Sequence, residues 1–262
     1  MSTPITLKST VDVNVIQSMG GDSLIVAAAK VSTNGTDAVS FAMTSDGPGG
    51  PFGVAKNSKG EPWTEKDSFG LINYLVMHRH GTPFEHSAIT FFVHAPIFVW
   101  REWHRHRIGF SYNEESGRYK QLDPIFYVPD RDRPMMCVPG WKPGRPKFTR
   151  CEDDSVFQTL FGNLTCSYQL AYRMYQENLN LGVDPGLARD CLPVGIYSGC
   201  WVTCNPRSLM AFISLRTHEP EAKQVSYPLW EIDVAARACE QALEVGWPIT
   251  YAAFVANGRV AP

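Results

Sequence analysis

Residues 101–119, with the sequence REWHRHRIGFSYNEESGRY, hold the side chains of this chain best suited to chemistry. Four arginines and two histidines stand there among three glutamates, two serines and four aromatic rings, although the whole chain is only 19% charged. Guanidinium groups bind oxyanions through paired hydrogen bonds and also stack on planar rings. The segment therefore predicts a site for a phosphorylated ligand with a planar ring, as in a nucleotide.

Two other chemistries compete for the same stretch. Six of the seven histidines fall between His78 and His106, which invites a metal site, but no HExxH motif is present and the arginines nearby disfavour a cation. The histidines are better interpreted as hydrogen-bonding or stacking groups, and no metal is expected. A serine hydrolase is also considered, because Ser111 and Ser116 lie near histidines and glutamates. The chain has no GxSxG elbow, so these serines are expected to donate to phosphate oxygens.

The remaining candidates favour structural roles. The glycine-rich run at 47–53 (GPGGPFG) lacks the lysine of a phosphate-binding loop, and a plain loop is expected there. Cys191 lies two residues after Arg189, but a free cysteine is more often buried in the core. Arg189 and Arg216 each end an apolar helical pattern, so the pattern alone favours surface arginines or partners of a helix dipole.

Local patterns predict the elements that position the cationic segment. Residues 87–94 (SAITFFVH) are β-branched and aromatic, which predicts a strand. Pro96 fits the first position of a helix reaching about Arg107, with Gly109 as its stop. On that helix Arg101 and Arg105 would share a face, as would Glu102 and His106. Residues 109–118 would then form a loop around the ligand.

The other elements predict an α+β fold in a single domain over residues 1–262, with a central, mostly antiparallel sheet flanked by helices. Strands and helices do not alternate as in a doubly wound sheet. Long irregular loops are expected at 35–62 and 129–154, the second a candidate lid. A further strand is expected at 194–203. Helices are expected at 24–30 (N-capped by Asp22), from Thr64 onward, and at 166–181, 184–189, 205–216 and 229–245.

Composition limits the partners and the location. A net charge of −2 argues against a general nucleic-acid binder, so anion binding must be local. We see no signal peptide and no run of about 18 apolar residues, which predicts a cytoplasmic protein without a membrane partner. The seven dispersed cysteines fit reduced thiols in that compartment.

In its motifs the chain resembles a flavin-dependent thymidylate synthase. The signature is Arg105-His106-Arg107, a short spacer, and then Ser116-Gly117-Arg118-Tyr119. Further similar blocks occur in the order of the family. These blocks are AAAKVS (27–32), HGTPFEH (80–86), APIFVWREW (95–103), ARDCLP (188–193), NPRSLMAFISLR (205–216) and the helix beginning near WEI (230–232).

The resemblance implies reductive methylation of dUMP to dTMP. Methylenetetrahydrofolate would supply the carbon, and FAD reduced by NADPH would supply the hydride. It also implies a homotetramer with shared active sites. Arg216 would activate the uracil ring and Ser116 would orient dUMP. The resemblance thus gives Arg189 and Arg216 a role in ligand binding in place of the structural role that their pattern alone favours.

The resemblance also assigns the site residues. The flavin contacts fall on Ser32, His80, Thr82, Arg105, His106, Arg107, Glu114, Asn205 and Arg207. The dUMP contacts fall on Glu102, Trp103, His104, Arg105, Glu114, Glu115, Ser116, Gly117, Arg118, Arg189 and Arg216.

Three departures from the family pattern bear on ligand fit. The spacer between Arg107 and Ser116 has one residue more than usual, which we place at Gly109-Phe110. Ala211 stands where relatives often carry an asparagine that holds the flavin. The segments 129–154 and 217–228 are longer than usual. The rival hypotheses are a nucleotide- or nucleic-acid-binding module that has lost catalysis, and a metal-dependent hydrolase.

Overall fold

The computed structural model describes residues 4–38, 56–57, 59–142 and 144–262. The glycine-rich run at 47–53 and most of the predicted loop at 35–62 lie outside these residues. The described start of that loop departs from the prediction, because Gly35–Ala38 forms the 3-10 helix η1 directly after helix α1 (Asp22–Asn34).

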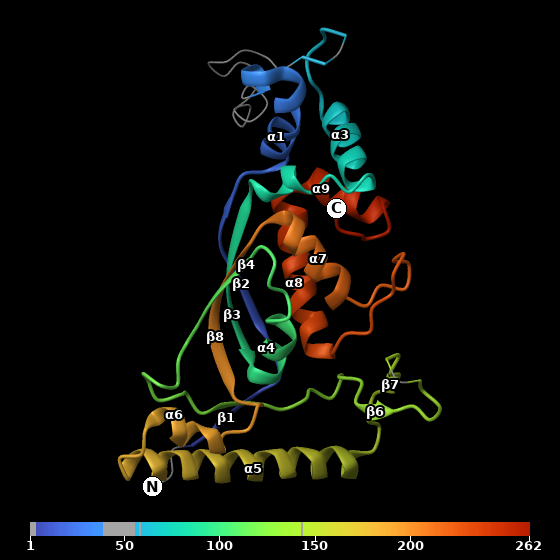
Figure 1. The fold of residues 1–262 in the computed structure, drawn as a ribbon. Coiled ribbons are helices and arrows are strands. Elements are labelled where there is room, and N and C mark those ends of the chain that lie inside the picture. Colours follow the sequence, from blue (N-terminus) through green and yellow to red (C-terminus); the bar gives the residue numbers. More distant parts are fainter. Residues whose placement is uncertain (1–3, 39–55, 58, 143) are drawn as a thin grey trace.

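The centre of the fold is a four-stranded antiparallel sheet, as predicted (Figure 1). Its strands run in the order β2 (Asp12–Met19), β3 (Ala88–Pro96), β8 (Tyr197–Cys204) and β4 (Phe110–Glu114). Alternate residues of β3, namely Ile89, Phe91, Val93 and Ala95, are buried in the core, as the period of two in a half-covered strand requires. Strand β2 was not predicted.

Helices cover one face of this sheet and one end of the molecule. Helices α7 (Pro206–Arg216) and α8 (Trp230–Gly246) pack against each other beside the sheet, and their apolar faces complete the main core. Helices α1, α3 (Glu65–Met77) and α9 (Pro248–Ala256) gather at one end (Figure 1). Thr64 caps α3 in a capping box with Asp67, as its position before the apolar pattern predicts.

A second, smaller core lies at the opposite end (Figure 1). Helix α5 (Asp154–Asn180) crosses that end and buries Tyr168, Tyr172 and Tyr175 against Phe126 of β5 (Ile125–Tyr127). Strand β5 pairs in parallel with β1 (Thr6–Lys8). The predicted start of this helix at Cys166 is wrong: α5 begins at Asp154, because the Asp153 carboxylate accepts from the amides of Ser155 and Val156.

The segment 129–154 is less irregular than predicted. It carries the short antiparallel pair β6 (Met136–Cys137) and β7 (Phe148–Thr149) before it enters α5. The helix predicted from Asp184 is α6 (Pro185–Ala188), which is followed at once by the 3-10 helix η4 (Arg189–Cys191). Another 3-10 helix, η3 (Thr82–Glu85), precedes β3.

Two absences hold for the described part of the chain. None of its helices combines the length and the apolar character needed to cross a membrane. Its histidines, cysteines and carboxylates nowhere form a group of three that could hold a metal ion.

Candidate active site

The arginine-rich segment leaves its helix earlier than predicted. Helix α4 (Ile97–Trp103) has Pro96 as its N-cap and ends at Trp103 rather than near Arg107. The reason is Tyr112, whose hydroxyl donates to the carbonyl of His106 at 2.6 Å and lies 3.3 Å from that of Trp103. The Trp103 carbonyl also accepts from the His106 amide at 2.9 Å, so the chain closes a tighter turn here instead of continuing the helical ladder. Arg101 and Arg105 therefore share no helical face.

The predicted ligand loop at 109–118 is also corrected, because its first half is strand β4. Gly109 allows this with a left-handed φ of +69°, which favours glycine. A Cβ at Gly109 would lie 2.1 Å from Oγ of Ser208, so the turn also passes close to helix α7. Phe110 then pairs with Cys204, and Glu114 pairs with Cys200 of β8.

The three residues of the Arg-His-Arg motif point in different directions. Arg105 and Arg107 are exposed, and neither has an ion pair among the described residues. His106 is half-buried, with its ring against Phe212 at 5.0 Å and Phe110 at 6.1 Å. The segment therefore presents two uncompensated cations to solvent while its histidine faces the protein.

His106 meets the residue expected to activate the uracil ring. The Nε of Arg216 donates to Nε2 of His106 at 3.0 Å. Its Nη1 donates to Oε2 of Glu102 at 2.7 Å, and its Nη2 donates to the backbone carbonyl of Glu102 at 3.0 Å. Burial, and then the charge of Arg216, lower the pKa of His106 from 6.5 to about 4, so the imidazole is neutral at physiological pH.

The two glutamates of the motif anchor its second half to β8. Glu114 accepts a hydrogen bond from the Ser198 hydroxyl at 2.6 Å, and Glu115 accepts one from the Gly199 amide at 2.8 Å. Lys120 also pairs with Glu115 at 3.1 Å. These contacts fix the start of the turn that carries Ser116, Gly117 and Arg118.

A cation from a distant segment reaches this turn. Arg189, in η4, is half-buried, and no hydrogen bond or ion pair of its side chain is recorded in the described structure. A Cβ at Gly117 would lie 3.1 Å from its Cδ, so glycine lets the arginine pack against the turn. Arg118 is exposed and lies over the Tyr119 ring at 5.5 Å. The turn thus joins two arginines and the Ser116 hydroxyl.

A second group of expected residues surrounds the start of α7. Asn205 caps this helix by accepting from the Ser208 amide at 2.8 Å. Arg207 donates to Glu85 of η3 at 2.5 Å and to the Pro262 carbonyl at 2.9 Å, so its charge already has a protein partner. Thr82, the first residue of η3, and His80, just before it, are exposed. The 3-10 helix η3 packs against α1, the helix that carries the exposed Ser32.

Two expected ligand contacts have rings packed inside the protein. The Trp103 indole is only 1% exposed and stacks on Phe212 at 4.6 Å. His104 stacks on Trp100 at 5.4 Å and meets Tyr112 edge-on at 4.8 Å. Their side chains therefore support the segment from behind.

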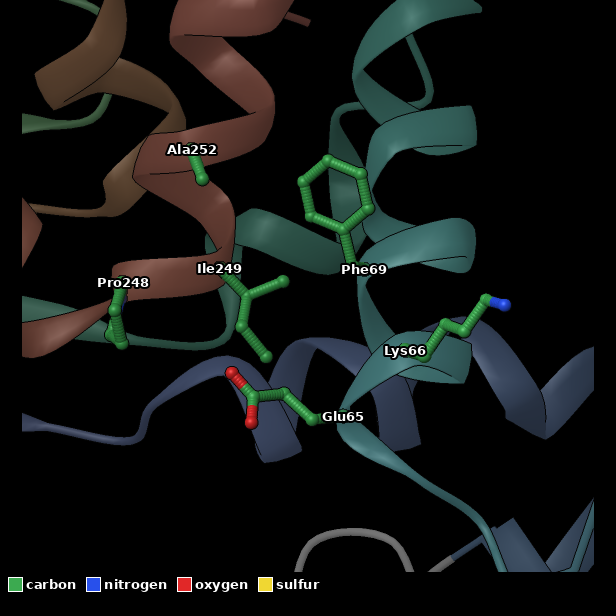
Figure 2. A pocket seen from close by; sticks show the side chains of 6 residues that line it. All are labelled: Glu65, Lys66, Phe69, Pro248, Ile249 and Ala252. Atoms are coloured by element: carbon green, nitrogen blue, oxygen red, sulfur yellow. The ribbon is translucent and has the colours of Figure 1, made fainter.

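Two hollows in the described part of the chain lie away from the expected residues. One groove of about 430 Å³ separates α3 from α9, where Phe69, Ile249 and Ala252 face each other while the Lys66 amine points away (Figure 2). A larger one of about 1080 Å³ lies between the β6–β7 segment and the start of α8. Neither is lined by a residue expected at the site.

Comparison with known proteins identifies the family of the chain. The family described as Thymidylate synthase complementing protein matches residues 14–249. The chain belongs to the flavin-dependent thymidylate synthase family. This confirms the resemblance carried by Arg105-His106-Arg107 and Ser116, and it makes the chain an enzyme of the methyltransferase class.

Family members resemble the chain over nearly its whole length. The flavin-dependent thymidylate synthase of Streptomyces coelicolor is 44% identical over 260 residues, covering 98% of this chain and 96% of the relative. That of Tropheryma whipplei strain TW08/27 is 39% identical over 254 residues, covering 97% and 96%. The crystal structure of the UMP/dUMP methylase PolB from Streptomyces cacaoi, bound with 5-Br UMP, has a TM-score of 0.83 at 38% identity, covering 99% and 100%.

The sequence did not indicate three residues that hold the expected site residues in place. Tyr112 ends α4, Ser198 binds Glu114, and Glu85 pairs with Arg207. A signal existed for Tyr112 alone, because Phe110, Tyr112 and Glu114 alternate with polar residues as one face of a strand does.

Proposed function

We propose that this chain methylates dUMP reductively to dTMP, with methylenetetrahydrofolate as carbon donor and with FAD reduced by NADPH. Its family membership and its likeness to a UMP/dUMP methylase support the uridylate substrate. The observation that carries the residue roles is the geometry of Arg216. His106 and Glu102 accept from three of its five N–H groups, so two N–H groups remain for a ligand.

Arg216 is the residue proposed to activate the uracil ring. A guanidinium against the N3/O4 edge stabilises negative charge that is delocalised there, and the electron density at C5 rises with it. Each pKa unit of such stabilisation corresponds to about 1.4 kcal/mol. Glu102 keeps the cation in place and leaves one N–H group on Nη1 and one on Nη2 free to donate to a ligand.

The donor set also fits the phosphates of a flavin dinucleotide. Arg105 and Arg107 are exposed cations without a carboxylate partner in the described chain, and guanidinium forks match phosphate oxygens. FAD, when bound and reduced, supplies the hydride that completes the methyl group. The residues proposed to hold it are Ser32, His80, Thr82, Arg105, His106, Arg107, Glu114, Asn205 and Arg207.

The Ser116 turn is proposed to hold the uridylate. Arg118 and Arg189 flank it without carboxylate partners in the described residues, which suits the 5′-phosphate. The Ser116 hydroxyl has no matched base, and it accepts only a 3.3 Å contact from the Arg118 amide, so it can orient the substrate as a donor. Glu102, Trp103, His104, Arg105, Glu114, Glu115, Gly117 and Arg216 complete the proposed set.

A homotetramer with shared sites is part of the proposal. The sheet face opposite α7 and α8 carries a row formed by Asn14, Phe92, Trp201 and Asn113, which the strand register places side by side. Trp201 in this row is 47% exposed. An exposed tryptophan beside a partly exposed phenylalanine supports an interface on this face, through which a second copy would complete the shared sites.

The deciding experiment is anaerobic. Purified protein reconstituted with FAD is reduced by NADPH, then mixed with dUMP and methylenetetrahydrofolate, and the products are identified by mass spectrometry. The proposal expects the protein to show flavin absorbance, the reduced flavin to be reoxidised when both substrates are added, and dTMP to form. Protein that binds dUMP and flavin but forms no dTMP would instead support the rival, a nucleotide-binding module without catalysis.

Arg216→Lys and Arg216→Ala provide matched variants. Both should bind flavin, and both should lose turnover, because lysine keeps the charge but not the fork. Turnover of Arg216→Ala near the wild-type value would remove the activating role.

UMP is a second candidate substrate. The structural relative PolB is a UMP/dUMP methylase, whereas the more similar Streptomyces coelicolor relative is a thymidylate synthase. Parallel turnovers with UMP and dUMP decide between the two, with a higher kcat/KM for dUMP expected.

A further inference from the structure

His106 can make its bond to Arg216 in only one chemical form. A guanidinium has N–H donors and no acceptor, so Nε2 of His106 must offer a lone pair to the Arg216 Nε at 3.0 Å. The proton of the neutral ring is then on Nδ1. Protonation would place two donors face to face and break the contact. The lowered pKa of His106, near 4, agrees with a ring that stays neutral.

The surroundings of His106 hold this ring in register. Its backbone carbonyl accepts from the Tyr112 hydroxyl at 2.6 Å, and Phe212, which lies one helical turn before Arg216, meets the ring edge-on at 5.0 Å. Burial raises the pKa of Tyr112 far above its ordinary value, so the phenol remains a donor. The charged group that faces the ring is Arg216, and Glu102 reaches it only through that arginine.

The three hydrogen bonds that Arg216 donates come from different nitrogens of its guanidinium. The two from Glu102 reach Nη1 and Nη2, the same end of the guanidinium that a ligand must use. The bond from His106 reaches Nε, next to the flexible stem. The acceptor at Nε acts together with the two acceptors of Glu102, so that all three nitrogens are held and the two remaining N–H groups point in a fixed direction.

We propose that His106, as a neutral Nδ1–H imidazole anchored by Tyr112, is a positioning residue that orients Arg216 toward the pyrimidine. This rests on the proposed function only in naming the pyrimidine; the imidazole–guanidinium contact stands without it. Besides its proposed flavin contact, the motif histidine thus acts through Arg216, while the arginines on either side of it are exposed.

The first test separates orientation from folding with paired variants. Glutamine can place an amide oxygen where Nε2 lies, whereas leucine fills similar space without an acceptor. We expect His106→Leu to lower kcat about 100-fold, because a small misplacement of a catalytic group costs that much. His106→Gln should stay within about fivefold of wild type, and the KM for dUMP should change by less than about threefold in both, since binding and orientation separate in this way.

Tyr112→Phe removes only the anchoring hydroxyl and should lower kcat about tenfold at an unchanged KM, as a smaller misplacement would. His218→Gln, outside the site, is the control and should match wild type. Equal kcat losses in His106→Leu and His106→Gln would overturn the acceptor role. So would a loss confined to KM.

The second test does not depend on turnover. In protein labelled with ¹⁵N-histidine, the His106 signals are assigned by their absence in His106→Gln. The proposal expects an unprotonated Nε2 and a protonated Nδ1 from pH 5 to pH 8, without substrate. A ring that titrates in that range, or one with its proton on Nε2, overturns it. If wild type makes no dTMP but shows the expected tautomer, the proposed function fails and the His106–Arg216 contact survives.

Discussion

The carboxylate of Asp22 binds the backbone of Thr250, 228 residues further along the chain. Its Oδ1 accepts from the Thr250 amide at 2.9 Å and from the Thr250 hydroxyl at 2.6 Å, and its Oδ2 accepts from the Ile249 amide at 2.8 Å. The two amides lie at the start of α9, where the helix itself provides them with no acceptor, and its N-cap residue Trp247 makes no side-chain bond. Asp22, expected to cap its own helix, lies in the first turn of α1 and caps another.

Asp22→Ala should therefore destabilise the junction of α1 and α9. The loss of a capping carboxylate costs about 1–2 kcal/mol, and the unpaired amides of Ile249 and Thr250 account for the cost. Chemical denaturation measures the free energy of unfolding. Glu221→Ala, at an exposed position of the 217–228 segment, is the control and should change it by less than about 0.5 kcal/mol. An Asp22→Ala protein as stable as its control would contradict the capping role.

The same carboxyl gives a pH dependence of known sign. Burial raises the pKa of Asp22 above 3.8, against the lowering effect of its bonds to Thr250 and Ile249. The native state then binds this proton more tightly than the unfolded state, so its contribution to stability falls as the pH rises through the raised pKa. The wild type should gain stability relative to Asp22→Asn as the pH is lowered toward 4. A difference that shrinks on acidification would show the opposite shift.

The elements that could be predicted are those with local signals. Helix α7 was predicted with its bounds, because Asn205 caps it and Pro206 fits its first turn. Helix α9 begins with Pro248 but has no side-chain cap from its own N-cap residue, and strand β2 has no clear local signal. Helix α9 is capped by Asp22 from the other end of the chain, and β2 exposes Val15 and Ile16, so it shows no clean alternation. The helix predicted from Cys166 is shorter than α5, because Gly162 and Asn163 interrupt the apolar pattern just before Cys166.

The directions in which the candidate site residues point could not be predicted from the sequence. Residue types predicted a nucleotide site, and the family followed from a resemblance carried by Arg105-His106-Arg107, Ser116 and the further blocks. Whether each of them faces solvent or protein depends on Tyr112, which ends α4 and draws His106 inward. A contact between residues 110 positions apart, such as His106 and Arg216, has no local signature.

The exposed cations on either side of His106 should bind the flavin phosphates. Arg105→Ala and Arg107→Ala should each weaken FAD binding about tenfold to a hundredfold, because a hydrogen bond to a charged group contributes about 1.5–3 kcal/mol. The loss should diminish as salt is raised, since the contacts are exposed. Arg101→Ala is the charge-matched control on α4 and should leave affinity within about threefold. Equal losses in all three variants, measured by flavin titration, would indicate general attraction rather than a site.

Gly117 should be needed for the position of Arg189. An alanine Cβ there would lie 3.1 Å from Cδ of Arg189 and from Cδ1 of Leu122, closer than ordinary contacts. Gly117→Ala should raise the KM for dUMP about tenfold and cost about 1–3 kcal/mol of stability through overpacking. Gly162→Ala, on α5 with nothing within 4 Å of the new methyl, should instead gain about 0.5–1 kcal/mol and leave KM unchanged. Identical KM values in the two variants would separate Arg189 from the substrate.

His106 should make the native state sensitive to acid. Its pKa is about 4 in the folded protein against an ordinary value of 6.5, chiefly through burial. Between these values the unfolded state binds more protons, so the free energy of unfolding rises with pH from about 4 to about 6.5 and is flat above. Because His106→Gln cannot titrate, its stability relative to wild type should improve as the pH falls through that window. His94, whose pKa burial also lowers, is present in both proteins and cancels in the difference. A difference that stays constant from pH 7 to pH 4 would mean that His106 does not remain neutral beside Arg216.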